Sequence, residues 1–463
     1  MGWCQSPPFF CAFTETAADS ANMALNTRPQ HLATKQHPLE ATSQNHIVPM
    51  EPTYHPNAHL PPGPPPSKDP LAYVDFYMDD FIGLAQRPRL TQTLHVLLNS
   101  IDLVFRGVPH PDDKPSRKQI ISASKLAAGE GAWSTSKSIL GWLVDTARGT
   151  IHLPAHKAAR LNKLIQEFTH KKRTSCKRWY SLLGELRHFS YAIRGATYLF
   201  SILHSLLTDN PTASRLRLHP HIQATLCDWH HLTTHMADNP VPITSLMPCA
   251  PSTIGCVDAS GEGIGGFWLP TCYGSTPPTV FHLAFPPHIK TQLVSAANPT
   301  GQLTNSNFEL AALVAGTAML IQHSPTHLGS VWFGSDNVAA VSWCQRGSTS
   351  SMGPNAHLLR WLAKLTQDQE ISLHAHTVPG SSNTLADFCS RSFHLQDSDF
   401  LQALNTHFPI APSWTLAQPT PDILWRMTST LSPRCCLGSL SPTSHRNRLH
   451  LENVAIILLI PAH

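Results

Sequence analysis

The sequence predicts a multidomain protein of the α+β and α/β classes, with a helical unit in front of a mixed-sheet domain. Three observations predict this. The chain has 463 residues, 41% of them hydrophobic, so it is long enough for two to four compact domains. Apolar residues recur with a helical period over 155–235. Strand-like and helical segments then alternate over 254–391, which is typical of a layered α/β fold.

Composition excludes several classes of protein. Only 13% of the residues are charged, against about 25% in an average soluble domain, and 29 are histidines, so a single histidine is weak support for a site. A formal net charge of +4 permits a nucleic-acid partner without establishing one. No apolar run approaches the ~18 residues of a membrane span. The first residues contain no basic segment of the kind that begins a signal peptide. We expect no membrane partner and an intracellular protein, in the cytoplasm or nucleus and not secreted.

The first third of the chain combines a linker with strand signals. Residues 26–70 lack apolar periodicity and end in a polyproline stretch, so they read as a Pro-rich insertion or linker. An apolar strand pattern over 71–84 is interrupted by the acidic run 77–80, which predicts two short strands that meet at a turn. A helix is predicted over 91–105.

The helical unit opens with an amphipathic helix over 155–170, and its period continues over 179–193 and 199–207. The Pro-containing stretch 238–252 closes it. Basic residues lie on and after the first helix: Lys157, Arg160, Lys163, Lys171, Lys172 and Arg173. An ordinary solvated helix face is the alternative to a nucleic-acid surface here.

Four carboxylates of the following domain stand where an element meets a turn or a helix begins: Asp258, Glu309, Asp336 and Asp387. Carboxylates at the ends of core elements can converge on one spot. Two Mg²⁺ ions about 4 Å apart need several hard oxygen ligands of this kind to act on a phosphodiester. Taken singly, each acid would more often be a solvated surface charge.

The amino-acid sequence around these acids resembles that of the ribonuclease H domain of retroelement polyproteins. The four acids follow one another at intervals of 51, 27 and 51 residues, and Ser390-Arg391 matches a Ser-Arg pair that often follows the last acid. The resemblance implies that all four acids hold two Mg²⁺ ions, with Mn²⁺ as a substitute, and that the domain cleaves RNA in RNA–DNA hybrids. A catalytically silent remnant that only binds nucleic acid is the alternative. The matching segments are 257–260, the glycines at 263, 265 and 266, 307–312, 334–337, 378–380 and 383–387.

Residues 73–85 resemble the palm hairpin of reverse transcriptases, whose paired aspartates hold metal. The matching pair is Asp79 and Asp80, and residues 2–10 resemble the preceding palm motif. The resemblance also implies a set of nucleic-acid-binding residues in the palm-like part and in the thumb-like helix after it: Gln5, Ser6, Pro7, Tyr77, Met78, Lys157, Arg160, Lys163, Lys171, Lys172 and Arg173.

The chain departs from the polymerase pattern in one respect. A palm needs a further aspartate, which family order puts before Ser6-Pro7, and the fingers are missing as well. Asp75 lies on the same predicted strand as the acidic turn and cannot replace it. We expect a fragment truncated at its N-terminus, with no RNA-directed DNA polymerase activity by this chain alone. A polymerase completed in trans by an upstream chain is a third interpretation.

The expected architecture is thus a partial reverse-transcriptase palm and a helical thumb, followed by a ribonuclease H-like mixed-sheet domain. DIRS-like elements are the most similar subclass and gypsy-like elements the second. The sequence does not indicate an oligomeric state. The expected regions are a partial palm at 1–25 and 71–150, a Pro-rich linker at 26–70, a thumb or connection at 151–237, a ribonuclease H-like domain at 250–395 and a poorly structured extension at 396–463.

Overall fold

The structure, a computed structural model, forms two compact units, which are described separately. The first comprises Met1–Pro154 and Asn447–His463, and the second comprises Ala155–Arg446. Most of the expected linker at 26–70 falls outside the residues that the structure describes. Among the described helices, none is long and apolar enough to cross a membrane. The described residues are 6–27, 37, 39–40, 70–78, 80–105, 120–192, 195–238, 240–243, 246, 250–271, 277–324, 329–349, 353–369, 371–432 and 454–459.

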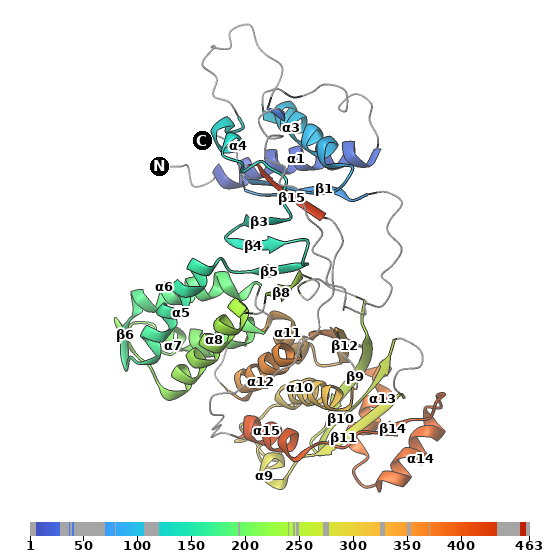
Figure 1. The fold of residues 1–463 in the computed structure, drawn as a ribbon. Helices are drawn as coiled ribbons and strands as arrows, with labels where there is room; N and C mark the ends of the chain where they lie inside the picture. Colours follow the sequence, from blue (N-terminus) through green and yellow to red (C-terminus); the bar gives the residue numbers. More distant parts are fainter. Residues whose placement is uncertain are drawn as a thin grey trace. The chain divides into compact units, whose positions relative to one another are not determined.

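A three-stranded antiparallel sheet is the framework of the first unit (Figure 1). In it, β2 (Asp80–Gln86) pairs with β1 (Ala72–Tyr77) on one edge and with β15 (Val454–Leu459) on the other. The predicted pair of strands around the acidic turn is confirmed. Strand β1 alternates buried and exposed residues along most of its length, because successive side chains of a strand point to opposite faces.

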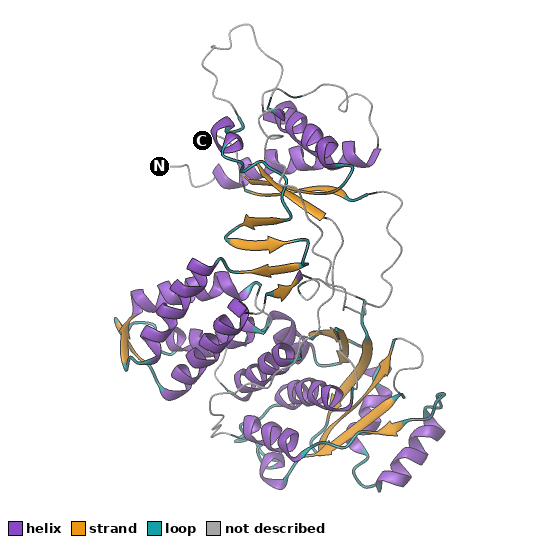
Figure 2. Ribbon diagram, in the orientation of Figure 1, coloured by secondary structure: helices purple, strands orange, loops and turns teal. Residues whose placement is uncertain are grey.

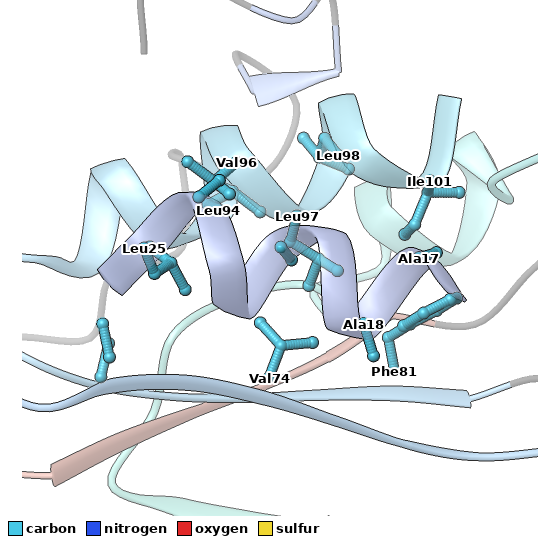
Figure 3. Close-up of a cluster of buried hydrophobic side chains, with 14 of the residues drawn as sticks. Ala17, Ala18, Leu25, Val74, Phe81, Leu94, Val96, Leu97, Leu98 and Ile101 are labelled. Carbon is cyan, nitrogen blue, oxygen red and sulfur yellow. The ribbon is translucent and has the colours of Figure 1, made fainter. Parts of the chain in front are cut away.

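Two helices, α1 (Ser6–Thr27) and α3 (Leu90–Phe105), pack on this sheet. Figure 3 shows Val74 and Phe81 of the sheet beside Ala17 of α1 and Leu97 of α3, all of which are buried. The predicted helix over 91–105 is confirmed. A short helix and three strands complete the described part of this unit: α4 (Ala123–Ala127), β3 (Ser136–Ile139), β4 (Trp142–Asp145) and β5 (Thr150–His152).

The second unit begins with a helical region. Helix α5 buries Ala158, Leu161, Ile165 and Phe168, so the predicted amphipathic helix is confirmed. Strands β6 (Arg173–Ser175) and β7 (Arg215–Arg217) pair as a small antiparallel ladder beside the helices. The other elements of this region are α5 (Ala155–Thr169), α6 (Cys176–Ser190), η1 (Ala196–Leu199), α7 (Phe200–Thr208), α8 (Pro220–Asp238) and β8 (Val241–Pro242).

A six-stranded mixed sheet follows, in the order β13-β12-β9-β10-β11-β14. Figure 2 shows its strands in orange beside the purple helices. Strands β9, β10 and β11 run antiparallel to one another, whereas β12 is parallel to both β9 and β13. The glycine-rich run 261–266 predicts a hairpin turn, and this is correct only for its start: residues 260–262 connect β9 to β10, whereas Gly263, Gly265 and Gly266 lie within β10. The strands are β9 (Thr253–Ala259), β10 (Gly263–Pro270), β11 (Thr279–Ala284), β12 (Ser330–Ser335), β13 (Ser372–Thr377) and β14 (Thr415–Leu416).

Neighbouring glycines of β10 let two helices approach opposite faces of the sheet. A side chain at Gly265 would collide with the backbone of Ser390 in α13, and one at Gly266 would lie 2.8 Å from the ring of Phe281. That ring also lies against Gly316 of α10, so α13 and α10 cover different faces. The helices of this part are α9 (Pro287–Lys290), α10 (Asn305–His323), α11 (Val338–Arg346), α12 (Pro354–Asp368), η3 (Gly380–Ser382) and α13 (Thr384–Arg391).

The prediction of little structure over 396–463 is wrong for four segments of it. After 395 the chain forms α14 (Asp397–His407), β14 and α15 (Pro421–Leu431), and strand β15 belongs to the first unit. Phe400 and Leu404 are buried beneath the sheet edge, and Ile423 and Met427 are buried on one face of α15. Apolar residues at i and i+4 were therefore present, but the frequent Pro and Ser around them obscured the period.

Candidate functional site

Three of the four predicted acids lie together at one edge of the mixed sheet. Oxygen atoms of Asp258, Glu309 and Asp336 all lie within 4.8 Å of one another. The register explains this arrangement, because parallel strands β9 and β12 pair Cys256 with Gly334, and an aspartate follows two residues later in each segment: Asp258 within β9 and Asp336 directly after β12. Asp258 and Asp336 thus stand at the same level of the sheet, and α10 adds Glu309 from the face that it covers.

Glu309 is the most enclosed acid of the cluster, with 1% of its surface exposed. The backbone N–H of Ala259 donates to its Oε1 at 3.3 Å, and Ser335 Oγ donates to its Oε2 at 3.2 Å. Burial, and then the charges of Asp258 and Asp336, raise the pKa of Glu309 to about 8. The carboxylate is therefore held in place without a cationic partner of its own in the described structure.

Asp258 is also buried, whereas Asp336 is exposed. Burial raises the pKa of Asp258 to about 6; a hydrogen bond from Ser390 opposes this, and the charges of Asp387 and Asp336 add to it. Gly380 passes close to Asp336, since a side chain there would lie 3.0 Å from the Asp336 Oδ2 atom. The absence of a side chain at Gly380 keeps this exposed carboxylate open.

Asp387 stands apart from the other three acids. It lies in the first turn of α13 with its side chain 46% exposed, and Arg391 Nε donates to its Oδ1 at 2.5 Å. Its charge still contributes to the raised pKa of Asp258, so the two carboxylates are near neighbours. The structure therefore places the fourth predicted acid at the rim of the cluster, where its carboxylate forms an ion pair with Arg391.

Ser390 joins the Asp258 carboxylate to the helix that carries Asp387. Its Oγ donates to Asp258 Oδ2 and also lies 3.0 Å from the backbone oxygen of Asp387. Ser260 Oγ donates to the backbone oxygen of Ser390 at 2.6 Å, which ties β9 to α13. Sequence reasoning noted Ser390 only as part of a matching pair and missed Ser335. The one signal for Ser335 was its place before Asp336.

Replacing Ser390 by Ala is expected to weaken divalent-cation binding by about tenfold, because groups that orient metal ligands typically contribute that much. The variant loses the donor that holds the Asp258 carboxylate but keeps the packing of a small, buried side chain. Calorimetric titration with Mn²⁺ measures the effect. The matched control is Ser398→Ala on the exposed side of α14. Unchanged affinity in Ser390→Ala would show that Asp258 is positioned by other contacts.

The chemistry of this donor set fits a divalent cation. Carboxylate oxygens are the ligands that Mg²⁺, Ca²⁺ and Mn²⁺ prefer, and the cluster offers no sulfur or imidazole ligand among the described residues. Burial and then the neighbouring negative charges raise the pKa values of Asp258 and Glu309, and a bound cation would relieve the repulsion between these charges. The site residues present are therefore compatible with the predicted Mg²⁺.

The palm-like prediction concerns residues that the structure describes only in part. Asp79 and Gln5 lie outside the described residues, and so do the side chains of Ser6 and Pro7 at the start of α1. Asp80 is the first residue of β2. Before it, Tyr77 at the end of β1 and Met78 in the turn are exposed, and Met78 takes a left-handed φ of 54°. The metal pair and the expected lack of polymerase activity stay predictions.

The predicted basic face of the helical region is partly neutralised. Arg160 pairs with Glu185 and Lys171 pairs with Glu167, while Lys157 is half-buried. The other three predicted cations, Lys163, Lys172 and Arg173, are exposed. Sequence reasoning missed Arg215 and Arg217, which β7 places across from β6. They lie about forty residues further along the chain, so no local signal joined them to Arg173.

Comparison with known proteins gives no family model and no curated protein that matches. Among solved structures, the chain is similar to a foamy viral protease-reverse transcriptase in complex with double-stranded DNA, at 12% identity and a TM-score of 0.29, over 66% of this chain and 46% of that chain. It is also similar to a ribonuclease H1 from Halobacterium salinarum NRC-1, at 15% identity and a TM-score of 0.22, over 30% of this chain and 92% of that chain.

A foamy viral protease-reverse transcriptase in complex with an RNA/DNA hybrid is similar at 12% identity and a TM-score of 0.22, over 53% of this chain and 30% of that chain. This chain thus spans less than half of the foamy viral proteins. The neighbours are reverse transcriptases and a ribonuclease H, without a DIRS-like or gypsy-like protein among those named here. With such low TM-scores, the functional conclusion rests on the acidic cluster alone.

Proposed function

We propose that the second unit is a retroelement-derived ribonuclease H that cleaves the RNA strand of RNA–DNA hybrids by two-metal hydrolysis. One observation carries the proposal. Oxygens of Asp258, Glu309 and Asp336 meet within 4.8 Å at one edge of a mixed sheet, which brings together acids that the sequence separates by up to 78 residues. Such a cluster of hard ligands suits divalent ions in phosphodiester chemistry.

The four acids would have different roles in metal binding, according to how deeply each one is buried. Asp258, Glu309 and Asp336 would hold one Mg²⁺ or Mn²⁺ ion, and Asp258 with Asp387 a second. The chemistry supplied by such ions, when bound, is polarisation of the phosphodiester and activation of the attacking water. Glu309 is fixed by two hydrogen bonds in the interior, so it anchors the cluster. Asp336 is exposed, so it is the member of the cluster that a nucleic-acid strand could reach from solvent.

The proposal is tested by Asp336→Asn, which keeps the shape of the side chain and removes its charge. Mg²⁺-dependent hybrid cleavage is expected to be lost, while hybrid binding and the thermal midpoint stay close to wild type. A helix cap is not at stake, because Asn337 caps α11: its Oδ1 accepts a hydrogen bond from Ala340 N at 3.0 Å.

The matched control is Asn337→Ala. It is expected to lower stability by about 1 kcal/mol through loss of the cap and to retain cleavage. A thermal midpoint and a cleavage rate are measured on both variants. Retained cleavage in Asp336→Asn, with reduced stability, would end the assignment of Asp336 as a ligand.

The competing function is a catalytically silent nucleic-acid-binding remnant. The Arg391–Asp387 ion pair is the feature that favours it, because the guanidinium engages the fourth carboxylate. Wild-type protein that binds a hybrid but does not cleave it with either Mg²⁺ or Mn²⁺ would support this function. The variant Arg391→Gln distinguishes an inhibitory arginine from an inactive site. If the arginine inhibits the site, cleavage should appear or rise in the variant; if the site is inactive, cleavage should stay absent.

A further inference from the structure

The β6–β7 ladder carries arginines on one face. Its register places Arg173 directly opposite Arg217, and Ser175 opposite Arg215. All three arginines are exposed, whereas Thr174 and Leu216, which point to the other face, are buried. Backbone N–H donors of residues 176 and 218 bond to the oxygens of 214 and 172. The Arg173–Arg217 pair therefore falls at a non-hydrogen-bonded position, where opposed side chains stand closer.

Like charges directly opposite on a ladder are destabilising. Residues 168–178 and 210–227, which contain the two strands, have no aspartate or glutamate at all. The nearby Glu167 is already engaged by both Lys171 and Arg178. No ion-pair partner for Arg173, Arg215 or Arg217 occurs among the described residues. Repulsion within this face is therefore not compensated by an ion pair from the residues that the structure describes.

Two further cations extend the same charge. Lys172 precedes β6 and Lys177 follows it in α6, and both are exposed without an ion-pair partner in the described structure. We call these five residues the arginine ladder: Lys172, Arg173, Lys177, Arg215 and Arg217. An anion bound across it would turn the repulsion into attraction, and a series of regularly spaced anions would engage several members together.

We propose that the arginine ladder binds the phosphate backbone of duplex nucleic acid. Guanidinium groups match phosphate oxygens with paired donors, and phosphate contacts position a duplex without reading its sequence. The inference rests on the proposed function, because it assigns a holding surface to the nucleic acid that the acidic cluster would cut. It differs from the sequence prediction in the residues that it uses. Arg160 and Lys171 form ion pairs with glutamates, so we assign the main phosphate contacts to Arg215 and Arg217 instead.

The test is binding of a fluorescein-labelled 20-base-pair RNA–DNA hybrid to the full chain in EDTA, by anisotropy, over a range of salt concentrations. Arg215→Gln/Arg217→Gln is expected to raise the Kd about tenfold at low salt and to reduce the slope of log Kd against log salt by about two. Single variants Arg217→Gln and Arg346→Gln form a matched pair, because Arg346 is an exposed arginine of α11 outside the ladder. Only Arg217→Gln should weaken binding.

An unchanged Kd and salt slope in the double variant would overturn the proposal. So would equal losses in Arg217→Gln and Arg346→Gln. Binding of labelled polyglutamate without measurable binding of the duplex would also overturn the proposal and would indicate an acidic protein partner. If the double variant proves less stable, Arg217→Lys keeps the charge and removes the paired donors. It should bind more weakly than wild type and more tightly than Arg217→Gln, and any other order contradicts the assignment.

Because EDTA prevents cleavage, this result is independent of the nuclease. Weakened binding in the ladder variants together with no cleavage by wild type would support the ladder and refute the proposed function. Cleavage that depends on Asp336, with no effect of the ladder variants on binding, would do the reverse.

Discussion

Replacing Asp258 by Asn is expected to reduce Mg²⁺-dependent hybrid cleavage by at least about a hundredfold, because a metal-bound site contributes several kcal/mol to the reaction. Asp258 lies at the centre of the cluster: it meets Glu309 and Asp336, and Ser390 donates to it from α13. In the proposed site it is the one acid shared by both ions. Its replacement therefore affects both.

The fold should tolerate this change. Burial raises the pKa of Asp258 to about 6, so the charged form is unfavourable in the metal-free protein, and a neutral isostere should leave the thermal midpoint unchanged or slightly higher. Asp399→Asn on exposed α14 is the control and should cleave like wild type. An Asp258→Asn protein that cleaves normally, or that unfolds at a clearly lower temperature, would show that Asp258 is structural.

The second large effect concerns pH. Without metal, the thermal midpoint of wild type is expected to fall relative to Glu309→Gln as pH rises from about 5 to about 8. In the folded protein the pKa of Glu309 is raised to about 8 from its ordinary value of 4.5. Between these values the folded state keeps a proton that the unfolded state has released, so stability declines with rising pH across this window. Asp258 contributes in the same direction up to about pH 6.

Divalent cations should reverse this decline. At pH 8, saturating Mg²⁺ is expected to raise the thermal midpoint of wild type and to have little effect on Glu309→Gln, because ligand binding to the folded state stabilises it. Glu262→Gln serves as a control, since Glu262 is an exposed acid paired with Lys290 outside the cluster. A wild-type midpoint that stays parallel to that of Glu309→Gln across the window would mean that Glu309 is not held in a charge-crowded interior.

Local pattern determined much of the fold. Period-two alternation with an acidic turn predicted the β1–β2 hairpin, and the apolar stripe over 155–170 predicted α5. The glycine run after Asp258 predicted a hairpin there, although its later glycines lie within β10 and only 260–262 form the connection. These signals are readable because they depend on residues a few positions apart. The helices and strand beyond 395 were missed because Pro and Ser masked a short period, and burial of Phe400 and Met427 is a long-range effect.

The sequence by itself determined which acids are candidates and that Asp258, Asp336 and Asp387 lie near the ends of elements. Only the tertiary structure decided which of these acids lie together and which one lies apart. Strand register brings Asp258 and Asp336 to one level, and α10 adds Glu309, but Arg391 holds Asp387 at the rim. The basic residues were likewise redistributed by long-range pairing. The physical reason is common to both: ion pairs, strand registers and pKa shifts depend on distances through space, and these arise only when distant segments pack together.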